Sequence, residues 1–174
     1  MKNKILATTI MLLLLFSILT QASDEKEKYA LACQAAKSGN KEAAFLSFLD
    51  ISRQHLKSKI HEDALFAVGE YYFEIADYRD AFNAFNKFSR DYSESKKKPF
   101  AVFYLYKTAQ LWGKETLEKE FREEIINLKQ VVLVFSQAKE YKYTSPFCIK
   151  YKLAYYIDKV ELYVNGELFA KVTY

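Results

Sequence analysis

The sequence predicts a mainly α-helical protein: a solenoid of about three helical hairpins, followed by a small C-terminal antiparallel β-hairpin or meander. Three observations predict this fold class. Apolar residues recur with a helical period over most of the chain. The composition has 14 Tyr and 14 Phe but only 4 Gly and 2 Pro, which favours long regular elements around a bulky core. From residue 141 onward polar and apolar residues alternate, as in a strand.

Residues 1–22 have the layout of a secretory signal peptide. Lys2 and Lys4 precede the apolar run ILATTIMLLLLFSIL, and small residues at Thr20 and Ala22 precede the charged stretch SDEKEK. The alternative is an uncleaved anchor, but the run is shorter than the ~20 residues that a spanning helix needs. We therefore expect cleavage after Ala22 and a periplasmic or secreted protein.

Residues 23–138 are expected to form six helices in three antiparallel pairs. Gly39 and Asn40 separate the first two helices, because Gly accepts a left-handed conformation and Asn caps the next helix. The stretches KSKIHED and SESKKKP separate the pairs, and a fifth helix is expected from about Pro99 to Trp112, closed by Gly113. The sixth helix, from about Thr116 to Phe135, carries one apolar stripe: Leu117, Phe121, Ile125, Leu128, Val132 and Phe135.

The central pair has small and large residues at fixed offsets. Numbered from Glu62 as position 1, the unit has Leu65 at 4, Val68 at 7, Gly69 at 8, Tyr72 at 11, Ala81 at 20 and Phe85 at 24. In these positions it resembles the tetratricopeptide repeat, although Phe88 and Ser93 stand where a small residue and Pro are usual. Gly69 and Ala81 should let the two helices approach closely. The alternative is a helical hairpin of another kind.

The flanking pairs match this pattern less well. The first has Ala32 and Ala44 at positions 8 and 20, but Ala35 at position 11 in place of an aromatic residue. The pair over residues 99–135 matches in pattern and length alone. Three such units are about the minimum for a stable stack.

The whole chain also resembles the periplasmic BamD-like proteins of outer-membrane assembly, which are built from such repeats. That resemblance implies a role in envelope assembly, with peripheral association to the outer membrane through partner proteins. Members of that family usually carry a lipid-anchor Cys directly after the signal core. Here Cys33 lies beyond the charged stretch, so we expect no lipid anchor.

The tail, residues 139–174, is expected to be a meander of two or three strands. Ile149, Tyr151, Leu153 and Tyr155 alternate with polar or small residues. Asn165-Gly166 is a strong hairpin signal, because both residues tolerate positive φ. The BamD-like resemblance offers the alternative of a helix at ELYVNGELF, within a truncated repeat. Asn-Gly inside a helix costs about 1 kcal/mol or more, which favours the hairpin.

We find no residue pattern for catalysis, a cofactor or a metal. His55 and His61 have no Cys or carboxylate at ligand spacing, and no glycine-rich phosphate loop or nucleophile elbow is present. After cleavage basic residues exceed acidic ones by only two, so no nucleic-acid partner is predicted. Whether Cys33 and Cys148 pair stays open, because sequence does not supply the geometry.

We therefore expect a non-enzymatic scaffold that binds a protein or peptide, and no small-molecule substrate. The first helix of each pair lines the concave side of such a stack. The resemblance to tetratricopeptide repeats assigns these concave positions to Tyr29, Lys37, Asp63, Phe66, Glu70, Phe73 and Glu74. In so small a stack the aromatic residues could instead belong to the core. The alternative function is a structural or accessory envelope protein whose hairpin adds a strand to a partner sheet.

Overall fold

The computed structural model describes residues 24–54, 58–130 and 139–174. The predicted signal peptide lies outside these ranges, as does the end of the predicted sixth helix at Phe135. Within the described ranges, no helix has the length and apolar character needed to cross a membrane.

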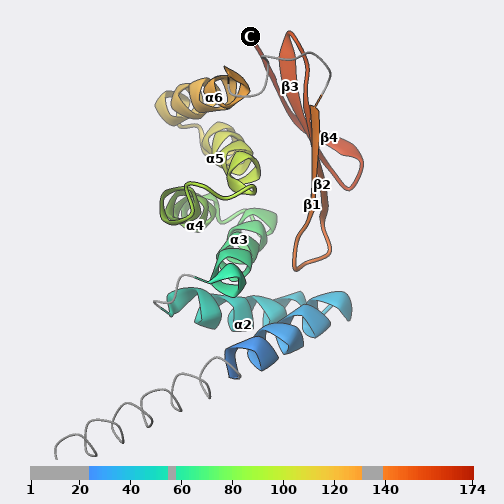
Figure 1. The fold of residues 1–174 in the computed structure, drawn as a ribbon. Coiled ribbons are helices and arrows are strands. Elements are labelled where there is room, and N and C mark those ends of the chain that lie inside the picture. Colours follow the sequence, from blue (N-terminus) through green and yellow to red (C-terminus); the bar gives the residue numbers. More distant parts are fainter. Residues whose placement is uncertain (1–23, 55–57, 131–138) are drawn as a thin grey trace, which may run out of the picture.

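The described helices form a stack in which each helix packs against the next along the chain (Figure 1). Residues 24–37 form the first helix. It is followed by α2 (Lys41–Arg53), α3 (Lys59–Glu74), α4 (Tyr78–Asp91), α5 (Lys98–Trp112) and α6 (Glu115–Gln130). The predicted mainly α fold of stacked helical hairpins is confirmed.

The turns within the three hairpins share one construction. Each contains a residue with positive φ: Gly39 at 85°, Ala76 at 61° and Gly113 at 71°. The residue after the first two of these caps the next helix, since Asn40 accepts a hydrogen bond from the Ala43 amide and Asp77 from the Asp80 amide. The predicted stop at Gly39 and cap at Asn40 are therefore observed.

Gly69 lets α3 and α4 approach closely, as the sequence pattern predicts. A Cβ added at Gly69 would lie 2.7 Å from Cζ of Phe85 on α4. The Phe85 ring in turn stacks on Tyr104 of α5, with centroids 4.5 Å apart, and Tyr72 contacts Phe45 of α2 at 5.1 Å. Each large residue thus reaches into the neighbouring hairpin.

Replacing Gly69 by leucine should lower the free energy of unfolding by about 1–3 kcal/mol as overpacking. The ring of Phe85 is fully buried and held by Tyr104, so it has little room to move away. Urea denaturation followed by circular dichroism measures the effect. Gly39→Asn is the control, because nothing lies within 4 Å of its added Cβ and Asn tolerates positive φ. Equal stability of Gly69→Leu and the wild type would contradict this packing.

The tail forms a four-stranded antiparallel sheet with the order β1-β2-β3-β4. Its strands are β1 (Lys139–Thr144), β2 (Lys150–Tyr155), β3 (Lys159–Val164) and β4 (Glu167–Thr173). Asn165 and Gly166 have φ of 52° and 91°, as the predicted hairpin requires. The helical alternative for this segment is therefore wrong. The expected two or three strands become four, because the strongly polar KEYKYT segment also pairs along β2.

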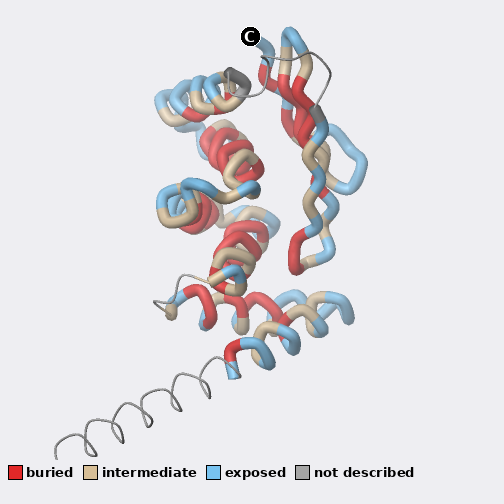
Figure 2. The backbone as a smooth tube through the Cα atoms, in the orientation of Figure 1, coloured by how far each residue is buried: buried red, intermediate tan, exposed pale blue. Residues whose placement is uncertain are grey.

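One face of the sheet packs against the helices. Tyr151, Leu153 and Tyr155 of β2 are buried on this face, as are Val160 and Leu162 of β3. Lys150 and Lys152 alternate with the buried residues of β2, as predicted, whereas the small side chain of Ala154 is buried as well. The buried parts of the helices and strands face each other in Figure 2 and form one continuous hydrophobic core. The sheet is thus docked on the stack.

Candidate partner-binding site

The sheet covers much of the side of the stack on which partner binding was predicted. It runs along α3 and α5, the first helices of the second and third hairpins (Figure 1). The Phe66 ring of α3 meets the rings of Tyr143 and Tyr151 edge-on, with centroids 5.4 and 5.9 Å apart. The hydroxyls of Tyr104 on α5 and Tyr151 on β2 are 2.7 Å apart. The chain's own strands thus occupy most of this concave face.

The predicted partner-binding residues on α3 are placed very differently from one another. Phe66 is 0% exposed and lies in the core, as the alternative interpretation of the aromatic positions held. Glu70 is 3% exposed, so it is buried as well. Phe73 is half-buried against the rings of Tyr104 and Phe169. Glu74 is exposed, and its carboxylate lies 2.5 Å from Lys41 Nζ. Of these four, only Glu74 is open to solvent.

Glu70 is a buried carboxyl at the junction of helices and sheet. The Tyr151 hydroxyl donates a hydrogen bond to its Oε1. Desolvation raises the pKa of Glu70 to about 8, while the hydrogen bond from the Tyr151 hydroxyl acts in the opposite direction. Glu70 Oε2 and Ser145 Oγ have no hydrogen-bond partner among the described residues. Burial thus favours the protonated form of Glu70 inside the core.

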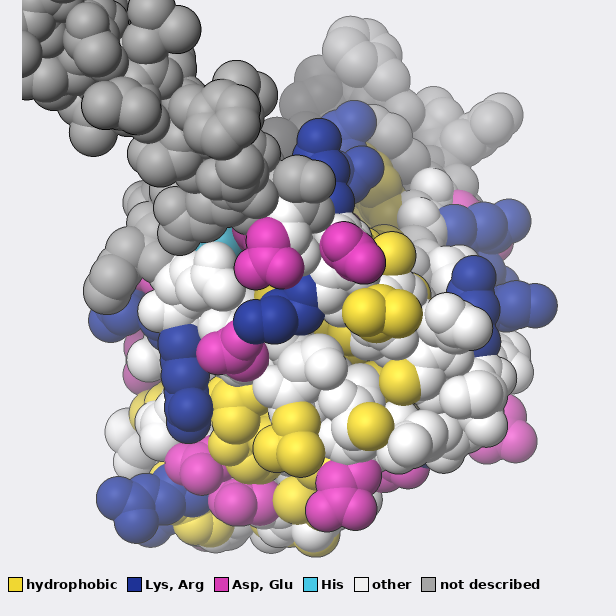
Figure 3. Space-filling model, turned by 90° about the horizontal axis from the view of Figure 1, so that it is seen from below, with side chains coloured by type: hydrophobic (Ala, Val, Ile, Leu, Met, Phe, Trp, Pro, Cys, Tyr) yellow, Lys and Arg dark blue, Asp and Glu magenta, His cyan; other side chains and the backbone are white. Residues whose placement is uncertain are grey.

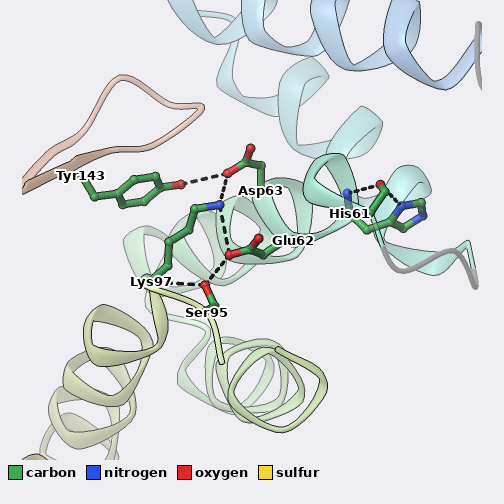
Figure 4. A network of polar contacts seen from close by, with 7 residues as sticks. His61, Glu62, Asp63, Ser95, Lys97 and Tyr143 are labelled. Carbon is green, nitrogen blue, oxygen red and sulfur yellow. Dashed lines mark hydrogen bonds and ion pairs between the residues drawn. The ribbon is translucent and has the colours of Figure 1, made fainter. Parts of the chain in front are cut away.

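A second polar cluster ties β1 to the helices (Figure 4). Lys97, in the loop before α5, contacts Asp63 and lies 3.3 Å from Glu62 Oε1, both on α3. Ser95 donates a hydrogen bond to Glu62, and the Tyr143 hydroxyl of β1 donates one to Asp63 over 3.4 Å. Its residues come from three separate elements, so this cluster holds β1 against α3 and the loop before α5.

A third cluster contains the residue types of a hydrolase triad without its geometry. Ser58 Oγ and Glu25 Oε1 both lie 2.9 Å from the same ring nitrogen of His61, Nδ1. A triad needs the nucleophile and the carboxylate on opposite nitrogens. Ser58 also accepts a hydrogen bond from the His61 amide, as the cap of α3. This cluster joins the first helix to α3.

An open pocket of about 440 Å³ remains at one end of the concave side. Three of the predicted partner-binding residues line it: Tyr29 and Lys37 on helix 24–37, and Asp63 on α3. Burial raises the pKa of Tyr29, and the neighbouring Asp63 carboxylate adds to that rise. The other lining residues are Cys33, Lys59, Lys97 and the β1–β2 segment Tyr143, Thr144, Ser145, Pro146 and Cys148. We call this cavity the end pocket.

The end pocket carries an excess of positive charge, with three lysines against one aspartate. Lys97 and Asp63 already neutralise each other. Lys37 and Lys59 take part in no ion pair with the residues that the structure describes. Sequence patterns did not assign Lys59 or the β1–β2 segment to a binding site. Ser145-Pro146 is a turn signal, however, and could have placed this segment at the end of a strand.

Among the described residues, open surfaces also lie outside the end pocket. A groove of about 450 Å³ between α2 and α4 has an apolar floor over α3 that includes Leu65, Val68 and Tyr72. The end of the stack seen in Figure 3 mixes hydrophobic side chains with charges of both signs. In the described part of the chain, no group of three or more His, Cys, Asp or Glu residues could hold a metal ion.

No protein-family model matches the sequence, and no curated protein matches it at a significant level.

Proposed function

We propose that this chain is an exported, non-catalytic scaffold of tetratricopeptide type, which binds a segment of a partner protein in cell-envelope assembly. The observation that carries the proposal is the end pocket. It is lined by Tyr29, Lys37 and Asp63, three residues assigned to partner binding from the sequence, and the β1–β2 segment forms another part of its lining.

The chemistry of the end pocket favours a peptide that carries a carboxylate. Its volume of about 440 Å³ lies in the range of small-ligand sites and suits a few side chains of an extended segment. Lys37 and Lys59 are available to attract negative charge, and the half-buried Tyr29 ring offers an apolar contact. Charge complementarity of this kind sets specificity and association rate more than affinity alone.

The cellular setting of the proposal comes from the sequence. The signal-peptide layout of residues 1–22 supports export to the periplasm or beyond. The resemblance to BamD-like proteins supports envelope assembly, with contact to the outer membrane through partners.

The proposal is tested with two fluorescent hexapeptides that differ only in having Glu or Gln at the same positions. We expect the protein to bind the Glu peptide more tightly in a fluorescence anisotropy titration. Replacing both Lys37 and Lys59 by Glu should weaken binding of the Glu peptide by about tenfold, or roughly 1.4 kcal/mol. The matched control is Lys26→Glu, since Lys26 is exposed on the same helix but does not line the pocket. If the double variant binds both peptides as the wild type does, the end pocket is not the binding site.

A second candidate function is strand addition at β4, which belongs to the hairpin predicted to add a strand to a partner sheet. It lies at an edge of the sheet and carries Leu168, which is 54% exposed. Near the end of β4, Arg122 of α6 donates a hydrogen bond to the Thr173 carbonyl. This bond occupies one of the backbone groups along the edge strand. Binding of an envelope partner that survives the double lysine change but is lost in Leu168→Lys would assign the function to this edge.

A further inference from the structure

We propose that Cys33 and Cys148 form a dithiol site at the end pocket, which closes to an intramolecular disulfide. They are the only two cysteines of the chain and lie far apart in the sequence. The fold places them in the lining of the same pocket, Cys33 on helix 24–37 and Cys148 on the β1–β2 segment. Both are free thiols in this structure.

The two thiols differ in their exposure to solvent, which suits an oxidation in two steps. Cys148 is exposed and open to an oxidant in solution, whereas Cys33 is half-buried. Burial raises the pKa of Cys33, Lys37 opposes that rise, and negative charge on Cys148 adds to it. The two sulfur groups are therefore electrostatic neighbours across the pocket. Cys148 also has a φ of 63°, within a tight turn in which its amide donates to the Ser145 carbonyl.

The reaction is thiol–disulfide exchange with a disulfide oxidant, for which oxidised glutathione is the probe. The Cys148 thiolate attacks one sulfur of glutathione disulfide, forming a mixed disulfide and releasing one glutathione thiolate. The Cys33 thiolate then attacks the Cys148 sulfur and expels the second glutathione. Two protein thiols are oxidised to one disulfide, and one glutathione disulfide is reduced to two glutathione thiols.

Closing this bond ties the β1–β2 segment to helix 24–37. Because the two cysteines stand on different walls of the end pocket, the bond crosses it and shuts out a peptide. The expected export places the protein in a compartment where such bonds persist. Formation of the bond is independent of the proposed function, whereas the loss of peptide binding rests on it.

The experiment treats reduced, purified protein with oxidised glutathione and follows the products by mass spectrometry. We expect a monomer lighter by two hydrogen atoms, in which a peptide map links Cys33 to Cys148. Closure should be about tenfold faster or more in buffer than in concentrated urea, since only the fold brings the thiols together. A native protein that accumulates only glutathione adducts or dimers would overturn the proposal.

The matched control moves one thiol along the helix, combining Cys33→Ser with Gln34→Cys. Gln34 is exposed and does not line the pocket, so this variant should stop at the mixed disulfide. Closure as fast as in the wild type would show that the pocket geometry does not direct the bond.

The Glu hexapeptide then probes both redox forms, and binding should be lost on oxidation. Unchanged binding would overturn the closing of the pocket, whereas a reduced protein that binds neither hexapeptide would count against the proposed function alone.

Discussion

Replacing Phe66 by alanine is expected to lower the free energy of unfolding by about 3–5 kcal/mol. The Phe66 side chain is fully buried, and its ring contacts aromatic rings from both the helices and the sheet. These are the rings of Phe85, Phe88, Tyr104, Tyr143 and Tyr151. Removing the ring leaves a cavity at the point where α3, α4, α5, β1 and β2 meet. Urea denaturation followed by circular dichroism measures the loss.

Leu46→Ala is the control for Phe66→Ala. Leu46 lies on α2 and is 58% exposed, so its removal should change the stability by no more than about 0.5 kcal/mol. A Phe66→Ala protein as stable as this control would mean that the sheet does not pack on the helices as described. Because Phe66 is part of the core, a loss of partner binding in Phe66→Ala would report on folding and not on the binding surface.

Replacing Glu70 by glutamine is expected to stabilise the protein by roughly 5 kcal/mol above pH 8 and to flatten its pH dependence. The folded pKa of Glu70, about 8, lies above its ordinary value of 4.5. Between these values the folded state holds a proton that the unfolded state has released, so wild-type stability falls as pH rises through this window. It levels off above pH 8. Glutamine stays neutral and keeps an oxygen that accepts from Tyr151.

Free energies of unfolding at pH 5, 7 and 9 test this prediction. Glu123→Gln is the control, because Glu123 is exposed on α6, a different helix from that of Glu70, and should leave the pH dependence of the wild type unchanged. If the wild type and Glu70→Gln lose stability in parallel as the pH rises, then Glu70 is not the group that titrates in this window.

The sequence by itself determined the secondary-structure elements and which consecutive elements pair as hairpins. Helical periodicity, the left-handed residue at Gly39 and the cap at Asn40 are local signals, so they placed the hairpins correctly. The approach of α3 and α4 at Gly69 was also predictable, because the two helices are consecutive. The Asn165-Gly166 turn was sufficient to predict the β3–β4 hairpin. The tail was expected to hold two or three strands, and β1 was not counted as a fourth, because a strand with so few apolar residues is recognised only through its pairing with β2.

Only the tertiary structure decided what the concave side of the stack contacts. A repeat pattern shows which residues face that side, but it does not show whether a partner or the chain's own sheet covers them. Burial depends on contacts between residues far apart in the sequence, such as Phe66 with Tyr151 and Glu70 with the same tyrosine. For the same reason the meeting of Cys33, Lys59 and Cys148 around one pocket has no signal in the sequence. Such meetings arise only when the sheet folds back on the helices, because its apolar face has to be buried.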